Sequence, residues 1–136
     1  MAFDRVWGDK IRKTVILDSS AILMCFEFSV DWERELARLL DAFHIVVPCA
    51  VVHELQILAE QESGQKKKKA QAALKLVCNY ETIDEVTRAA DEAILKIAQR
   101  TNGVVLTNDK ELRKRLLSHH IPVIFLRGKK RLALEQ

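Results

Sequence analysis

The sequence predicts an α/β protein in which helices wrap a parallel sheet. Short β-rich apolar runs alternate along the chain with longer segments of helical period, and this alternation is typical of such folds. The 136 residues fall within the range of a single domain. Hydrophobic residues make up 49% of the chain and charged residues 30%. This composition is typical of a folded globule and not of a disordered or fibrous chain.

Five apolar runs are predicted to be strands, and the third has the weakest pattern. The five runs are residues 14–17, 44–47, 77–83, 104–107 and 123–126. Helical period and capping residues predict helices in most of the gaps between them. These helices are a short one after residue 19 or 20, then 32–42, 48–62, 67–76, 85–100 and 109–117. The segment QESGQKKKK is predicted to be a break between two helices.

Several capping residues support these helix limits. Asp31 suits the start of the second helix, and Pro48 suits the start of the third. Thr82 or Asp84 is expected to begin the helix over 85–100, and Asn102-Gly103 to end it with a residue at positive φ.

We expect residues 1–136 to form one domain, with residues 1–12 as an N-terminal extension and residues 128–136 as a basic C-terminal tail. No apolar run approaches the roughly 18 residues of a membrane span. The first dozen residues lack the apolar stretch of a secretory signal, so a cytoplasmic location is expected. Cys25, Cys49 and Cys78 stand among apolar neighbours and are interpreted as reduced core residues.

Positive charge is concentrated in two parts of the chain. Residues 66–69 are four consecutive lysines, and residues 110–136 hold eight basic residues against two acids, although the net charge of the whole chain is only +3. Basic side chains of this kind hold phosphate backbones without reading bases. A solvated lysine run is an equally good interpretation of residues 66–69.

Two predicted strands end on acidic residues. Asp18 follows the first strand directly, and Asp109 is the last residue of the run VVLTND, two positions after the predicted strand over 104–107. All strands of a parallel sheet end at the same edge, where ligands bind, so we expect these two carboxylates to meet. Glu54 lies early on a helix at the border of its apolar face, and Asp91 lies at a similar border in the middle of the helix over 85–100. The four acids are therefore predicted to share one cleft, with Asp91 semi-buried.

Four carboxylates in one cleft repel each other and lose solvation, unless a cation compensates. Carboxylate oxygens with water are the ligands that Mg²⁺ or Mn²⁺ accept, and two such ions can promote phosphodiester hydrolysis. Each acid also has a simpler interpretation. Asp18 can be a helix cap, Asp109 can favour its helix dipole beside a capping box of Asn108 with Glu111, and Glu54 and Asp91 can be ordinary boundary residues.

Other enzyme classes on parallel sheets fit less well. Neither G-x-x-x-x-G-K-[ST] nor G-x-G-x-x-G occurs, so nucleotide-binding loops of those types are excluded. A haloacid-dehalogenase-type phosphatase needs a second aspartate where Ser20 stands, and a phosphoaspartyl signalling domain needs a second acid cluster beside the first aspartate. A metal-dependent nuclease fits best.

Four motifs together resemble the PIN-domain nucleases, over about residues 13–127. They are VILDSSAIL, VVHELQIL, ADEAILKIA and VVLTNDKELRKRLLSHHIPVIFL, in the family's order and spacing. The resemblance implies a three-layer α/β/α sandwich around a five-stranded parallel sheet of order 3-2-1-4-5, and a Mg²⁺- or Mn²⁺-dependent endoribonuclease that cuts single-stranded RNA. The resemblance places the family's metal-binding acids at Asp18, Glu54, Asp91 and Asp109. It places the hydroxyls that orient them at Ser20 and Thr107.

The last of these motifs looks closer to the PIN branch that processes ribosomal RNA precursors than to toxin nucleases. A homodimer is expected from family behaviour. The predicted RNA-binding side chains are the basic residues of the two positive segments. They are Lys66, Lys67, Lys68, Lys69, Lys110, Arg113, Lys114, Arg127, Lys129 and Lys130. The alternative function is a non-cleaving RNA-binding or assembly factor on the same fold.

Overall fold

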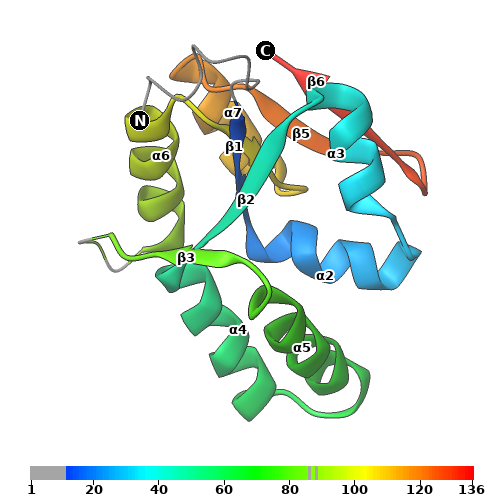
Figure 1. The fold of residues 1–136 in the computed structure, drawn as a ribbon. Coiled ribbons are helices and arrows are strands. Elements are labelled where there is room, and N and C mark those ends of the chain that lie inside the picture. Colours follow the sequence, from blue (N-terminus) through cyan, green and yellow to red (C-terminus); the bar gives the residue numbers. More distant parts are fainter. Residues whose placement is uncertain (1–11, 86, 88) are drawn as a thin grey trace.

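A computed structural model describes residues 12–85, 87 and 89–136, so almost all of the expected extension over residues 1–12 lies outside the described residues. The chain forms a six-stranded sheet of order β3-β2-β1-β4-β5-β6 (Figure 1). The strands are β1 (Lys13–Leu17), β2 (Phe43–Pro48), β3 (Glu81–Ile83), β4 (Val104–Leu106), β5 (Val123–Arg127) and β6 (Arg131–Glu135). Strands β1 to β5 pair in parallel, which confirms the α/β class and the predicted order 3-2-1-4-5.

Strand β6 extends the sheet beyond the prediction. It pairs antiparallel with β5, and Arg131 lies opposite Arg127 across a turn at Gly128, where φ is +74°. We expected residues 128–136 to be a basic tail, and this was wrong for residues 131–135. The basic residues of this segment predicted a solvated tail, although polar and apolar residues alternate along it as in a strand. Leu132 is only 2% exposed and packs into the core.

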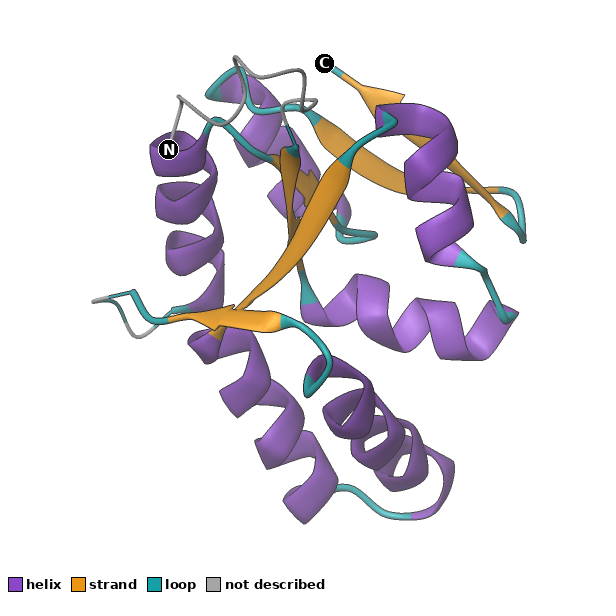
Figure 2. Cartoon of the chain, viewed as in Figure 1, coloured by secondary structure: helices purple, strands orange, loops and turns teal. Residues whose placement is uncertain are grey.

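Six helices connect the described strands (Figure 2). They are α2 (Ser19–Phe28), α3 (Trp32–Leu40), α4 (Cys49–Gln61), α5 (Gly64–Val77), α6 (Ala90–Thr101) and α7 (Lys110–Ser118). The lysine run lies inside α5 and not at a helix break, because the break falls earlier, at residues 62–63. The weak strand over 77–83 shrinks to β3, since its first residue still belongs to α5.

Helix α6 begins five residues later than predicted. Neither Thr82 nor Asp84 caps it; Ala89 precedes its first turn in an extended conformation. Strand β3 lies at one edge of the sheet and β4 lies three places away in the strand order, so the connection that carries α6 passes two strands. At its other end α6 closes as predicted, with Asn102 at φ 53°.

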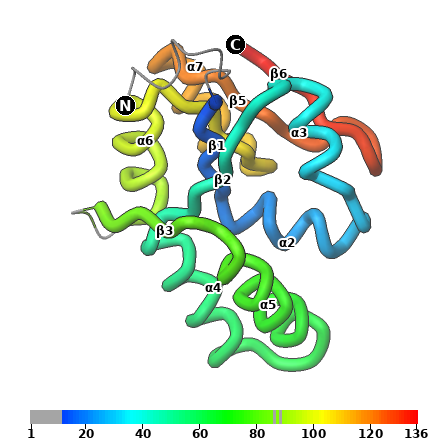
Figure 3. Tube along the Cα trace, in the orientation of Figure 1, coloured from blue at the N-terminus to red at the C-terminus, as the bar shows by residue number. Residues whose placement is uncertain are grey.

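The helices form two layers over the sheet and one projection. In Figure 1, α2 and α3 lie on one side of the sheet, and α6 and α7 lie on the other. The α4–α5 hairpin extends past the edge where the parallel strands end, as the tube in Figure 3 shows. This three-layer arrangement matches the predicted sandwich. It leaves the carboxyl edge of the sheet bordered by the starts of α2, α4, α6 and α7.

The cysteines differ in their surroundings. Cys25 is buried, and burial raises the pKa of its thiol to about 12. Cys49 and Cys78 are exposed, so the prediction of three core cysteines was wrong for two of them. Both stand at helix ends, where Cys49 opens α4 and Cys78 follows α5. Among the described residues, no helix combines the length and the apolar character needed to cross a membrane.

Candidate active site

The site begins where β1 and β4 end side by side. The two strands are neighbours, with Leu17 opposite Leu106, and the Asp18 amide donates to the Leu106 carbonyl at 3.1 Å. Parallel pairing therefore brings the residues after both strands to the same place. Asp18 is 5% exposed and Thr107 is fully buried, so a carboxylate lies at the boundary of the core beside a buried hydroxyl.

Two hydroxyl groups orient the Asp18 carboxylate. Ser20 Oγ donates to Asp18 Oδ2 at 2.6 Å, and Thr107 Oγ1 donates to the same oxygen at 2.7 Å. Each hydroxyl also accepts a backbone hydrogen bond, Ser20 from the Asn108 amide at 3.1 Å and Thr107 from the Asp109 amide at 3.1 Å. These acceptor contacts leave the hydroxyl protons directed at Asp18. The hydrogen bonds that described residues make to this carboxylate all go to Oδ2, so Oδ1 is the oxygen left for a ligand.

Asp109 caps helix α7. Its Oδ1 accepts from the backbone amides of Glu111 at 2.9 Å and Leu112 at 3.3 Å. The helix cap is thus Asp109. The capping-box interpretation required Asn108 at this position and was wrong. A carboxylate that caps a helix through one oxygen can still present the other oxygen to a cation, so the two roles are compatible.

Glu54 lies in the second turn of α4 and contacts the start of α2. Its Oε1 accepts from Ser19 Oγ at 2.9 Å. Although the residue has solvent-exposed surface, desolvation raises the pKa of its carboxyl group; the Ser19 hydrogen bond opposes this shift, and the charges of Asp18 and Asp91 add to it. Ser19 is the first residue of α2. Its contact with Glu54 joins residues 35 positions apart and has no local sequence signal.

Asp91 lies in the first turn of α6 and is exposed, whereas we predicted it in mid-helix and semi-buried. The late start of α6 explains both differences. Desolvation raises the pKa of Asp91, the charges of Asp18 and Asp109 raise it further, and the charge of Arg115 lowers it. Each of the four acids therefore acts electrostatically on at least one other acid of the set.

Arg115 links the helices that carry two of these acids. Its side chain, on α7, pairs with Glu92, the neighbour of Asp91 on α6. This ion pair joins residues 23 positions apart and depends on how the two helices pack, so it has no local sequence signal. The pair joins α6 to α7, and its hydrogen bond lowers the pKa of Glu92.

The four acids fit a divalent cation in the chemistry of their oxygen atoms. Carboxylate oxygens are the ligands of Mg²⁺ and Mn²⁺, and the mutual repulsion of these side chains is what a cation would relieve. Within the described residues, no three histidine, cysteine or acidic side chains stand close enough to hold an ion between them. Mg²⁺ usually binds through one or two carboxylates and keeps several waters, so a tight protein cage is not required.

The predicted RNA-binding residues fall into three groups. Lys66 to Lys69 lie on the first half of α5, where Lys66 pairs with Glu62 at 3.7 Å. Arg113 on α7 is already engaged, because it pairs with Glu135 at 3.1 Å and stands 4.0 Å from the centroid of the Phe125 ring.

The remaining predicted residues are solvent-exposed. Lys110 and Lys114 lie on α7, while Arg127, Lys129 and Lys130 lie at the end of β5 and in the turn that follows. The turn stands at the same sheet edge as Asp18, since β1 and β5 run in the same direction.

The chain is similar in sequence to known proteins. Residues 15–129 match the family described as PIN like domain. Ribonuclease VapC4 of Methanocaldococcus jannaschii is 33% identical over 120 residues, which cover 85% of this chain and 92% of that protein. Ribonuclease VapC9 of Archaeoglobus fulgidus is 28% identical over 135 residues, covering 99% and 98% of the two chains.

Solved structures share the fold. The PIN domain endonuclease Utp24 superposes with a TM-score of 0.74 at 22% identity, covering 90% of each chain. A domain of a functionally unknown protein from Methanocaldococcus jannaschii gives a TM-score of 0.63 at 22% identity, covering 91% of this chain and 97% of that one. The family match spans most of the chain, and it includes the strands and helices that carry all four acids. The chain belongs to the PIN-like domain family.

Proposed function

We propose that this protein is a metal-dependent endoribonuclease that hydrolyses phosphodiester bonds of single-stranded RNA. The observation that carries the proposal is the buried Asp18 carboxylate, oriented by two hydroxyls at a sheet edge where three further acids approach it. Two curated relatives are named ribonucleases, which supports RNA as the substrate class.

Each residue has a defined part in this proposal. Asp18, Glu54, Asp91 and Asp109 hold Mg²⁺ or Mn²⁺. Ser20 and Thr107 orient Asp18, and Ser19 orients Glu54. A metal ion held there would supply an activated water and would stabilise the leaving oxygen of the cut phosphodiester. Orienting groups of this kind commonly change metal affinity or activity 10- to 100-fold when they are removed, on an order-of-magnitude scale.

Finer assignments complete the proposal. The motif resemblance favours a ribosomal RNA precursor as substrate, and the likeness to the Utp24 structure supports the fold for this assignment and not the substrate. We also propose a cytoplasmic location, which follows from the sequence pattern, and a homodimer, which follows from family behaviour. Lys66 to Lys69, Lys110 and Lys114 remain proposed contacts to the RNA backbone.

The proposal is tested by metal removal. Purified protein is expected to cut a labelled single-stranded RNA in the presence of Mn²⁺ or Mg²⁺, and to stop cutting when a chelator is added. Products resolved on a denaturing gel report internal cleavage, and a duplex of the same sequence serves as the matched substrate. Cleavage that persists in excess chelator would contradict the metal's role. Tight RNA binding without cleavage at any metal concentration would favour the assembly-factor alternative.

A further inference from the structure

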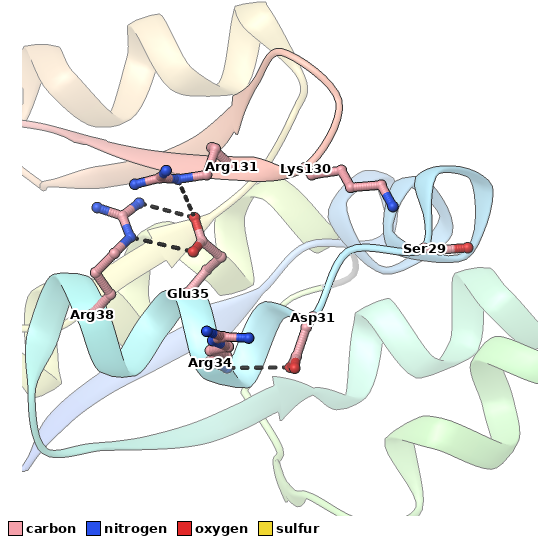
Figure 4. A pocket seen from close by; sticks show the side chains of 7 residues that line it. All are labelled: Ser29, Asp31, Arg34, Glu35, Arg38, Lys130 and Arg131. Carbon is pink, nitrogen blue, oxygen red and sulfur yellow. Dashed lines mark hydrogen bonds and ion pairs between the residues drawn. The ribbon is translucent and has the colours of Figure 1, made fainter.

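A second charged surface lies away from the acids, between α3 and the β5–β6 turn. Figure 4 shows this groove from close by. Its cavity volume is about 640 Å³. It is lined by Ser29, Asp31, Arg34, Glu35, Arg38, Lys130 and Arg131. Four cationic side chains therefore face two carboxylates, and the surface is positive overall. We call it the α3 groove.

Glu35 organises the floor of the α3 groove. Its carboxylate accepts from Arg38 Nε at 3.2 Å and Nη2 at 2.9 Å, and from the Leu132 amide at 2.9 Å. It also pairs with Arg131 Nε at 3.3 Å. The Arg38 hydrogen bonds and then the Leu132 amide lower the pKa of Glu35 to about 2, so this residue is charged at neutral pH.

One partly buried carboxylate thus holds two guanidinium groups in place. The Glu35 side chain is only 13% exposed, whereas those of Arg38 and Arg131 are 41% and 67% exposed. Arg38 is fixed further, because its Nη2 donates to the Leu132 carbonyl at 2.8 Å. Two cations share one anion, so positive charge remains on the exposed face. Fixing these side chains in advance reduces the ordering cost of binding a phosphate there.

Arg34 and Lys130 supply the remaining positive charge of the groove. Figure 4 shows Lys130 extending from the turn toward Ser29, and Arg34 standing on the first turn of α3. Both side chains are exposed. Asp31 acts mainly as the cap of α3, since its Oδ1 accepts from the Arg34 amide at 3.3 Å. A second hollow shares Arg38 and Arg131 with the groove and adds Arg127, so the positive surface continues along β6.

Helix α2 connects the α3 groove to the acidic site. Asp18 precedes its first residue, and Ser29, which lines the groove, follows its last. A helix of ten residues is about 15 Å long, at 1.5 Å for each residue. The groove also lies beside the β5–β6 turn, and this turn leaves β5 on the same side of the sheet as Asp18 leaves β1. An RNA strand that is cut at Asp18 would therefore need to extend along the length of α2 to reach the α3 groove.

We propose that the α3 groove binds the phosphate backbone of the same single-stranded RNA, at a distance from the cut bond. This inference rests on the proposed ribonuclease function and adds to it a second contact region formed by Arg34, Arg38, Lys130 and Arg131. Arginine side chains suit the role because their planar guanidinium groups match phosphate oxygens. The contact would not read bases, so it would favour longer RNA over shorter RNA irrespective of sequence.

The test compares RNA length and salt dependence in a protein that does not cut. In the Asp18→Asn variant, affinity is measured for two RNAs. The short RNA reaches only the acidic site, and the long RNA can extend along α2 to the α3 groove. We expect the longer RNA to bind more tightly. The double variant Arg34→Gln with Lys130→Gln should lose about tenfold in affinity for the long RNA at low salt. The slope of log affinity against log salt should fall by about 1.4, since each phosphate contact on a single strand contributes about 0.7.

A matched control removes two exposed lysines outside the groove. Lys75→Gln with Lys96→Gln makes the same change in net charge on α5 and α6, and should leave both the length dependence and the salt slope as they are in the parent protein. Equal losses in the two double variants would overturn the groove assignment, because net charge alone would explain them. So would an unchanged affinity of the Arg34 and Lys130 variant for the long RNA. Either result leaves metal-dependent cleavage by the wild type standing, so the two proposals fail separately.

Discussion

The Asp18→Asn variant is expected to fold like the wild type and to lose at least about 100-fold in RNA cleavage. Asparagine has the same shape, and its side-chain oxygen can still accept from Ser20 and Thr107 in place of Oδ2. Its amide nitrogen takes the place of Oδ1, and an amide nitrogen does not bind Mg²⁺. Removing a group that only supports a metal ligand already costs about 10- to 100-fold, so loss of the ligand itself should cost at least as much.

Cleavage rates at saturating Mn²⁺ measure this effect, and thermal unfolding checks the fold. Asp84→Asn is the matched control, since Asp84 is an exposed acid on the loop after β3. The control should cut RNA at the wild-type rate. If Asp18→Asn also cuts at that rate, Asp18 is not part of the active site.

Replacing Thr107 with valine should lower both stability and activity. Thr107 is fully buried; its hydroxyl donates to Asp18 at 2.7 Å and accepts from the Asp109 amide at 3.1 Å. Valine has nearly the same shape but removes both contacts, which leaves a buried carboxylate with one donor fewer and a backbone amide without its acceptor. Unsatisfied buried groups cost about 1–3 kcal/mol each. We expect a loss of about that size in the free energy of unfolding, and about 10- to 100-fold slower cleavage.

Denaturant unfolding and cleavage assays measure the two effects. Thr107→Ser keeps the hydroxyl and loses one methyl group, so it should retain most of the activity and lose roughly 1 kcal/mol of stability. A valine variant that unfolds at the wild-type denaturant concentration and cuts RNA at the wild-type rate would contradict the role of the Thr107 hydroxyl in orienting Asp18.

The part of the site that follows from strand pairing could be predicted from sequence. Asp18 and Thr107 come directly after two apolar runs, and neighbouring parallel strands must place their ends together. The hydrogen bond between them follows from this rule, although they are 89 positions apart. The strand order 3-2-1-4-5 was implied by the family resemblance and not by the apolar runs, and the structure confirms it for β1 to β5.

The contacts that depend on helix packing could not be predicted. Ser19 meets Glu54 because α2 and α4 start side by side, and Arg115 meets Glu92 because α7 packs near α6. Neither contact has a periodic signal. The late start of α6 also moved Asp91 from the middle of a helix to its first turn. Strand β6 was missed because its basic residues were interpreted as a solvated tail, while its apolar residues complete the edge of the core.

The central claim is that four acids from separate elements surround one metal-binding position. Diffraction from crystals soaked in Mn²⁺, recorded where manganese scatters anomalously, tests it most directly. We predict an anomalous peak within bonding distance of Asp18 Oδ1, with carboxylate oxygens of Asp109, Asp91 or Glu54 in contact directly or through water. A peak bound elsewhere on the chain, with the Asp18 carboxylate free of manganese, would contradict the account.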